Sequence, residues 1–199
     1  MLLSLSRPLP RLFPTLSPSL RTLSSSSRPT ILFCGAGNMA AAMIKPLLTS
    51  SSFPTPPEVL FTDVSPSTRA GIKKLHPTAI DCTDDLVELT KGRKVDVVVI
   101  AVKPQNCDDL YRTLHPALSQ MSSPPVILSI CAGVPVASFE RGLGTTKIIR
   151  SMPNTPAMIE RGVTVWAEGK NGGISGEEVE MVRGMLVSFG TEIKVEDEK

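Results

Sequence analysis

The stretch "TILFCGAGNMA", Thr30–Ala40, decides the fold of this chain. Its first five residues form a short apolar run of the kind that makes a buried strand. A glycine-rich turn comes next, and the stretch "AAAMIKPLL" that follows it favours a helix. The order is therefore strand, tight turn and helix, which is the repeating unit of an α/β sheet.

The spacing of the glycines in this turn matches a sequence pattern with a known chemical role. Gly35, Gly37 and Ala40 match the pattern G-x-G-x-x-G/A. In that pattern the first glycine allows the tight turn, the second lets the backbone approach a pyrophosphate, and the small third residue lets the helix pack against the sheet. The pyrophosphate would lie at the helix N-terminus, where free N–H groups favour anions. The turn predicts dinucleotide binding, and the alternative is a glycine-rich turn in another kind of α/β protein.

The rest of the chain repeats the alternation of strands and helices. Further strands are expected at residues 59–62, 79–81, 95–102, 124–133, 146–152, 163–169 and 191–195. Helices are expected at 66–75, 84–91, from after 106 to about 118, and 175–189, with Ser65 and Ser175 as caps. The pattern predicts one α/β domain over residues 30–199. Its fold would be a doubly wound, Rossmann-type sheet, mostly parallel, with helices on both faces.

An acidic residue follows the second expected strand. Asp63 stands where a carboxylate can accept a hydrogen bond from the ribose 2′-hydroxyl, which favours NAD. Ser65 and Arg69 come shortly after it and could meet a 2′-phosphate instead. The other interpretation of Asp63 is a turn residue without a ligand. The choice between NADH and NADPH therefore stays open at this point.

Three more loops follow buried strands, at the side of the sheet where ligands bind in open α/β folds. They are "AVKPQ" (Ala101–Gln105), "ICAGVP" (Ile130–Pro135) and "SMPNTP" (Ser151–Pro156). Each one alone could be an ordinary strand exit. Together with the glycine turn, they predict backbone amides and small side chains beside a nicotinamide ring.

Composition narrows the class of protein. The chain has 199 residues and a formal net charge of +2. Four arginines lie in residues 1–29, so the remainder carries 17 basic and 19 acidic residues. A body so close to neutral predicts no nucleic-acid partner. No apolar run approaches the roughly 20 residues of a membrane-spanning helix, so no membrane partner is expected.

The cysteines and histidines predict no metal site. The four cysteines have neither a CxxC motif nor a metal-ligand spacing, so we expect small core side chains in a reducing compartment. His76 and His115 each precede a proline, and we expect both at helix ends or in loops rather than in catalysis.

Residues 1–29 are rich in Leu, Ser and Arg and contain no acidic residue. This composition is typical of a mitochondrial or plastid presequence, although four prolines would interrupt the helix that such a segment forms. The alternative is a disordered tail of a cytoplasmic protein. We expect a mitochondrial location and exclude residues 1–29 from the fold.

Four stretches together resemble a known family. "ILFCGAGNMA", "DVVVIAVKPQ", "SICAGVPVASFERGL" and "IIRSMPNTPAMIERGVTVWA" are similar to the N-terminal domain of pyrroline-5-carboxylate reductase. The resemblance covers residues 30–199 with the motifs in order. It implies an oxidoreductase that reduces the C=N bond of 1-pyrroline-5-carboxylate with NADPH or NADH. The product would be L-proline, in the last step of proline biosynthesis.

The resemblance and the motifs together give the candidate site residues. Those expected along the cofactor are Gly35, Ala36, Gly37, Asn38, Met39, Ala40, Asp63, Ser65, Ala101, Val102, Lys103, Pro104, Ile130 and Ala132. The resemblance implies that Pro153, Asn154 and Thr155 line the hydride-transfer cleft. It places Glu196 near bound substrate. No residue is assigned a catalytic role with certainty, because a protonated imine accepts hydride without a strong side-chain acid.

The chain also departs from the family pattern. Val64 stands where many relatives have an arginine, which weakens any inference of NADPH preference. Asp84 or Asp85 stands where relatives often place an asparagine against the adenosine ribose. The segment "VEDEK" at the C-terminus corresponds to the point where the family continues into a helical domain. That domain forms the homo-oligomer and most of the substrate-carboxylate pocket.

The position of this helical domain in the family determines what we expect of the chain in solution. We expect the chain to hold the cofactor half of the site, to bind NAD(P)H, to turn over poorly, if at all, and to be monomeric or poorly soluble. The alternative function is a catalytically inactive dinucleotide-binding module or a truncated gene product.

Overall fold

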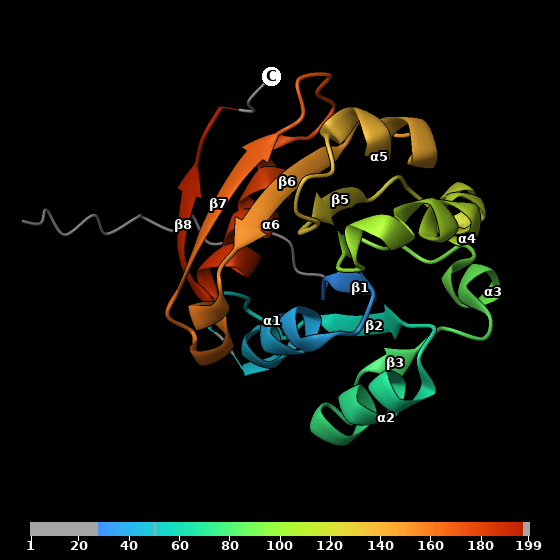
Figure 1. Cartoon of the computed structure of the whole chain (residues 1–199), viewed down its shortest axis with the longest axis horizontal. Coiled ribbons are helices and arrows are strands. Elements are labelled where there is room, and N and C mark those ends of the chain that lie inside the picture. The colour runs from blue at the N-terminus through green and yellow to red at the C-terminus, as the bar shows by residue number, and fades with distance from the viewer. Residues whose placement is uncertain (1–27, 50, 197–199) are drawn as a thin grey trace, which may run out of the picture.

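The fold is one sheet with helices packed against both faces (Figure 1). The structure, a computed structural model, describes residues 28–49 and 51–196. Within these residues the strands follow the order β3-β2-β1-β4-β5-β6-β7-β8. In chain order they are β1 (Thr30–Cys34), β2 (Glu58–Thr62), β3 (Ile80–Asp81), β4 (Val97–Ile100), β5 (Val126–Ser129), β6 (Ile148–Pro153), β7 (Gly162–Glu168) and β8 (Gly190–Lys194).

The sheet is parallel except at one pair. β6 and β7 run antiparallel, while the other neighbouring pairs run parallel. The chain leaves β3 at one end of the sheet and returns to pair β4 with β1, so the strand order reverses between β1 and β4. In a doubly wound fold this reversal is the topological switch point. The predicted fold class is confirmed.

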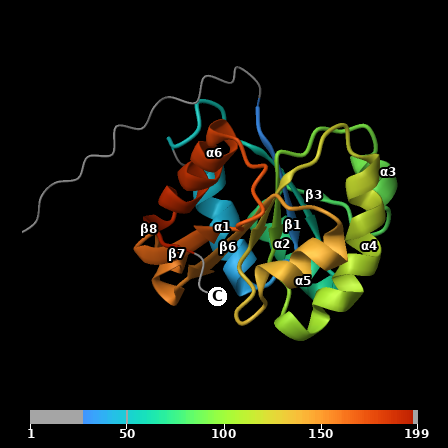
Figure 2. The ribbon, with the colours of Figure 1, turned by 90° about the horizontal axis from the view of Figure 1, so that it is seen from above.

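The helices are divided between the two faces. They are α1 (Asn38–Thr49), α2 (Pro66–Leu75), α3 (Leu86–Thr90), α4 (Cys107–Gln120), α5 (Val136–Leu143) and α6 (Gly176–Val187), with short 3₁₀ turns η1 (Pro104–Asn106) and η2 (Thr155–Ile159). Side chains of α1, α2 and α6 share one apolar core, and those of α3, α4 and α5 share the other. Figure 2 shows α1 and α6 on one side of the strands and α3, α4 and α5 on the other.

Alternation along the central strands builds both cores. In β1, Ile31 and Phe33 point into the α1–α6 core, while Leu32 and Cys34 point into the α3–α5 core. All four side chains are fully buried. A strand buried on both faces must be apolar throughout, which is why the β1 sequence is a continuous apolar run rather than an alternating one.

The predicted helix caps are confirmed. Ser65 is the N-cap of α2, and its hydroxyl oxygen accepts from the Thr68 N–H at 3.3 Å. Ser175 and Glu178 form a reciprocal capping box at the start of α6. Both caps satisfy N–H groups that have no partner inside the helix.

Several local predictions differ from the structure, and β5 at Val126–Ser129 is shorter than the strand predicted at 124–133. α5 was not predicted, although its eight residues place Phe139 and Leu143 on one buried face. β4 is limited to Val97–Ile100, half the length of the apolar run around it. His76 is the C-cap of α2, as expected, but the prediction for His115 was wrong. Helix α4 continues through Pro116 to Gln120 because Leu114 and Ala117 remain packed in the core.

The described fold begins two residues before the predicted boundary. Residues 1–27, and with them almost all of the predicted presequence, lie outside the described residues. The Arg28 guanidinium donates to the carbonyl oxygens of Pro56 and Pro57, and the Pro29 carbonyl accepts from the Glu58 N–H at 2.8 Å. These bonds attach the chain in front of β1 to the start of β2.

Two further findings concern membrane-spanning helices and metal-binding clusters. None of the helices within residues 28–49 and 51–196 combines the length and the apolar character that a bilayer crossing requires. The same residues hold no group of three His, Cys, Asp or Glu side chains placed to bind a metal ion. Cys34, Cys82, Cys107 and Cys131 are buried and unpaired, which confirms that they are core side chains.

We expect Gly35→Ala to destabilise the fold and Gly71→Ala to stabilise it. Gly35 has φ +95°, and a Cβ there would lie 2.8 Å from the Ala101 carbonyl carbon, so the cost should be about 1–3 kcal/mol. Gly71 lies inside α2, and a Cβ there meets nothing within 4 Å, so alanine should add roughly 0.5–1 kcal/mol. Urea unfolding of both variants measures the two changes. Equal stabilities would contradict the geometry at Gly35.

Candidate functional site

The carboxyl ends of five of the parallel strands, β2, β1, β4, β5 and β6, lie along one edge of the sheet. Cys34 pairs with Thr62 on one side and with Ile100 on the other, and Ile100 pairs with Ser129. β6 continues parallel to β5 and ends at Pro153. The residues that follow these strand ends form what we call the carboxyl edge. Ligands of open α/β sheets bind at this edge, beside the switch point.

The glycine turn at the carboxyl edge is held between two strands. The Gly35 N–H donates to the Thr62 carbonyl at 2.8 Å, and the Ala101 N–H donates to the Cys34 carbonyl at 2.8 Å. Gly35 is buried against the peptide that joins Ala101 and Val102, at a distance that leaves no room for a Cβ. The tight turn predicted at Gly35 is therefore also a close contact with the exit of β4.

The second glycine faces open space. Gly37 is exposed, and a Cβ built on it would meet no heavy atom within 4 Å. Its carbonyl accepts the Ala41 N–H at 2.9 Å, which makes Gly37 the N-cap of α1. Glycine has no side chain to cap the first N–H groups of that helix. The N-terminus of α1 therefore presents amide donors and a positive dipole end to open space.

The remaining residues of the turn divide between surface and core. Asn38 is exposed and Met39 is half-buried, so both can face a ligand at the start of α1. Ala40 is 1% exposed and packs into the core between α1 and the sheet. A small residue at this position allows the close packing that the sequence pattern predicts.

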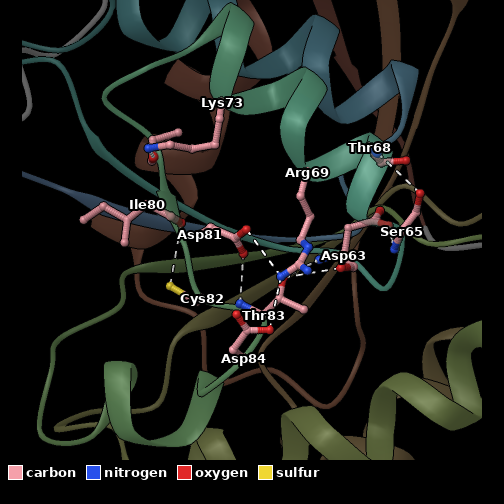
Figure 3. A network of polar contacts seen from close by, with 11 residues as sticks. Asp63, Ser65, Thr68, Arg69, Lys73, Ile80, Asp81, Cys82, Thr83 and Asp84 are labelled. Carbon is pink, nitrogen blue, oxygen red and sulfur yellow. Dashed lines mark hydrogen bonds and ion pairs between the residues drawn. The ribbon is translucent and has the colours of Figure 1, made fainter.

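Asp63 stabilises the glycine turn through hydrogen bonds to its carboxylate. One carboxylate oxygen accepts from the Ala36 N–H at 2.8 Å, and the other accepts from the Ser65 N–H at 2.8 Å. Its own N–H donates to the Thr83 hydroxyl at 3.0 Å. Figure 3 shows Asp63 near Ser65 and Thr83. Asp63 is thus a structural turn residue as well as a carboxylate at the position predicted to meet ribose.

A network that sequence analysis did not identify connects the exits of β4, β5 and β6. The Ser151 hydroxyl donates to the Ser129 carbonyl at 3.1 Å, and the Cys131 N–H donates to the Ser129 hydroxyl at 3.2 Å. The Cys131 thiol donates to the Val102 carbonyl at 3.2 Å. These bonds fix the backbone of the predicted nicotinamide loops relative to one another. Small polar residues at the ends of apolar strands were the available signal for this network.

The loop residues themselves differ in exposure. Ala101, Val102 and Ile130 are half-buried, whereas Lys103, Pro104 and Ala132 are exposed. The exits of β4 and β5 lie side by side, and each presents partly accessible apolar side chains next to exposed residues. Such a surface suits contact with one face of an aromatic ring while its polar substituents remain in water.

The exit of β6 is a rigid loop packed on α1. Pro153 ends the strand, and the Asn154 side-chain oxygen accepts from the Val163 N–H at 2.9 Å. Thr155 begins η2, where Ala157 is fully buried in the core that α1 shares. Figure 1 shows η2 beside α1. The "MPNTP" loop is therefore held next to the helix that the glycine turn begins.

One predicted site residue does not lie at this edge. Glu196 follows β8, which runs parallel to β7 and hence opposite to β6. The chain at Glu196 therefore heads away from the end of β6 that carries Pro153, and its side chain is exposed. The structure of this chain does not bring Glu196 together with the other candidates, and its substrate role stays a prediction.

The comparisons with known proteins agree with this geometry. Residues 30–133 match the family described as NADP oxidoreductase, coenzyme F420-dependent. The chain belongs to this family. It is 34% identical over 174 residues to a pyrroline-5-carboxylate reductase of Pseudomonas aeruginosa, covering 86% of this chain and 59% of that protein. It is 30% identical to the pyrroline-5-carboxylate reductase of Pisum sativum, covering 84% and 58% respectively.

A solved structure supports the same relationship. The pyrroline-5-carboxylate reductase of Coxiella burnetii matches with a TM-score of 0.71 and 26% identity, covering 86% of this chain and 60% of that one. The resemblance predicted from the motifs is confirmed. The chain spans somewhat less than two thirds of the length of each of these three relatives.

The buried thiol in the loop network predicts a loss of stability at high pH. Burial raises the pKa of Cys131 to about 12, whereas an unfolded cysteine titrates near roughly 8.5. Above pH 8.5 the unfolded chain therefore binds fewer protons than the folded chain, so unfolding becomes easier as pH rises toward 12. Each such thiol contributes about 1.4 kcal/mol per pH unit.

We expect wild type to lose more stability than Cys131→Ala between pH 8 and pH 10. The cavity that the substitution leaves lowers the free energy of unfolding by the same amount at both pH values, so it does not affect the comparison of the two pH slopes. Urea unfolding at both pH values measures it. Identical slopes for the two proteins would show that the Cys131 thiol ionises as readily in the folded state as in the unfolded state.

Proposed function

We propose that this chain binds a reduced nicotinamide dinucleotide at the carboxyl edge. We further propose that the protein reduces 1-pyrroline-5-carboxylate to proline. The observation that carries the first part is the open space beside Gly37 at the uncapped N-terminus of α1, next to the switch point. The second part rests on the similarity to pyrroline-5-carboxylate reductases.

The residues present fit the pyrophosphate of such a cofactor. The first N–H groups of α1 would donate to the phosphate oxygens, and the helix dipole would offset their charge. The carboxylate of Asp63 holds the Ala36 N–H, so this part of the turn is already fixed before a ligand arrives. A preformed anion site loses little conformational entropy on binding.

The opposite end of the cofactor would lie along the loops after β4 and β5. Val102 and Ile130 are half-buried there and would contact the face of the nicotinamide ring. The bonds among Ser129, Cys131 and Val102 keep these two loops at a fixed separation. Pro153 and Thr155 would bound the side on which an imine substrate approaches.

The chemistry needs orientation more than acid catalysis. A bound reduced nicotinamide would supply a hydride to the carbon of the protonated imine, whose C=N electron pair would become the amine lone pair of the product. The protein's loops would hold the ring and exclude water from one face. Fixed orientation of this kind can account for several kcal/mol of a reaction barrier.

The second candidate function is dinucleotide binding without turnover. It requires only the cofactor-binding features of the carboxyl edge, the open space at Gly37 and the turn held by Asp63. Both functions require nucleotide binding at the same edge. Addition of 1-pyrroline-5-carboxylate to the chain with NADH or NADPH, followed by absorbance at 340 nm, separates them. Oxidation supports the reductase, and binding without oxidation supports the second candidate.

We expect Gly37→Val to weaken nucleotide binding at least about tenfold, because the side chain would fill the space proposed for the pyrophosphate. The fold should tolerate it, since no heavy atom lies within 4 Å of a Cβ at this position. Nicotinamide fluorescence titration gives the dissociation constant, and thermal unfolding checks the fold.

Gly176→Val is the matched control. Gly176 is the first residue of α6, and a Cβ there also meets nothing within 4 Å. It should leave the dissociation constant unchanged. If both variants bind as wild type does, the pyrophosphate does not lie at Gly37 and the proposed site is wrong.

A further inference from the structure

A polar cluster surrounds one arginine beside the proposed adenosine ribose. We call residues 63–69 and 81–84 the β2–β3 corner. The Arg69 guanidinium lies 3.2 Å from an Asp84 oxygen and 3.5 Å from an Asp81 oxygen. Figure 3 shows the arginine reaching from α2 toward both carboxylates. The only cation of this corner is therefore already paired with two acids.

The acids are themselves positioned by the backbone. One oxygen of Asp81 accepts from the Thr83 N–H at 3.0 Å, while its other oxygen faces Arg69. The Thr83 hydroxyl donates to the Asp63 carbonyl at 3.3 Å. The loop after β3 is thus tied to the end of β2, and its carboxylates stay close to Asp63.

Three neighbouring positions of this corner offer a 2′-phosphate an engaged hydroxyl, no N–H and no charge, respectively. The Ser65 hydroxyl accepts from the Thr68 N–H and lies 3.0 Å from the Ser67 hydroxyl. Pro66 has no N–H to offer at the start of α2. Val64, which follows Asp63 directly, is 94% exposed and carries no charge.

We propose that the β2–β3 corner selects NADH over NADPH, an inference that rests on the proposed dinucleotide site. Asp63 accepts a hydroxyl of the adenosine ribose. Asp81 and Asp84 hold Arg69 so that it does not serve a 2′-phosphate. The corner carries three carboxylates and one guanidinium, so a 2′-phosphate would meet a net negative surface. Like charges placed together in this way exclude a ligand more effectively than a missing contact does.

The first test compares nucleotides on the wild-type chain. Dissociation constants of NADH and NADPH are measured by fluorescence titration, and 5′-AMP and 2′,5′-ADP are compared by calorimetry. We expect NADH to bind at least about tenfold tighter than NADPH, and AMP tighter than 2′,5′-ADP. Equal or tighter binding of the 2′-phosphorylated ligands would overturn the inference while leaving the proposed dinucleotide site intact. Binding of none of the four would instead overturn the proposed site.

The second test releases the arginine. Asp84 is 92% exposed in its side chain, so Asp84→Asn removes one carboxylate with little effect on the fold. We expect it to reduce the NADH preference by about two- to fivefold, as for the removal of one exposed ion pair. In the Asp84→Asn variant the freed guanidinium should strengthen NADPH binding. The double variant Asp84→Asn with Arg69→Gln lacks this guanidinium, so it should bind NADPH no more tightly than wild type does.

Asp108→Asn is the matched control for charge. Asp108 lies on α4, outside the β2–β3 corner, and its replacement changes the net charge of the chain by the same amount. It should leave the ratio of the two dissociation constants unchanged. If Asp108→Asn shifts the ratio as much as Asp84→Asn does, the selection comes from overall charge and the role assigned to Arg69 is wrong.

Discussion

The contact between Gly35 and the peptide joining Ala101 to Val102 is the constraint on which the candidate site depends. It brings the turn after β1 against the exit of β4, the two strands between which the sheet order reverses. A side chain at Gly35 would separate them, because the backbone atoms lie closer than any Cβ permits. Glycine at this position therefore lets the turn before α1 lie directly against the loop that follows β4.

Asp63 gives the same turn a second support. Its carboxylate accepts N–H groups from both the glycine turn and the start of α2, so its two oxygens link the turn after β1 to the loop after β2. A carboxylate in this role also sets the sign of the potential where ribose would bind. One side chain thus stabilises the turn and, in the proposed site, also contacts the ribose, so a substitution at Asp63 would change both properties together. The neighbouring Asp84 offers a cleaner way to change the charge alone.

Sequence predicted the elements that have strong local signals. The apolar run of β1, the glycine turn and the caps at Ser65 and Ser175 each specify their structure within a few residues, and all are present. Tertiary contacts decide the rest. Helix α4 passes through Pro116 because its buried face continues, and the loop network around Ser129 and Cys131 joins residues that lie more than 20 positions apart. Asp63 was predicted as a ribose contact or a turn residue, and its two hydrogen bonds show the second role directly.

The central claim is that a dinucleotide lies across the carboxyl edge at the switch point. Amide chemical shifts of the ¹⁵N-labelled chain, recorded with and without NADH, test it most directly. The account predicts large shifts at residues 35–40, at 101–103 and at 130–132, with the amides of β7 and β8 unchanged. Shifts that are absent from residues 35–40, or that appear mainly on β7 and β8, would contradict it.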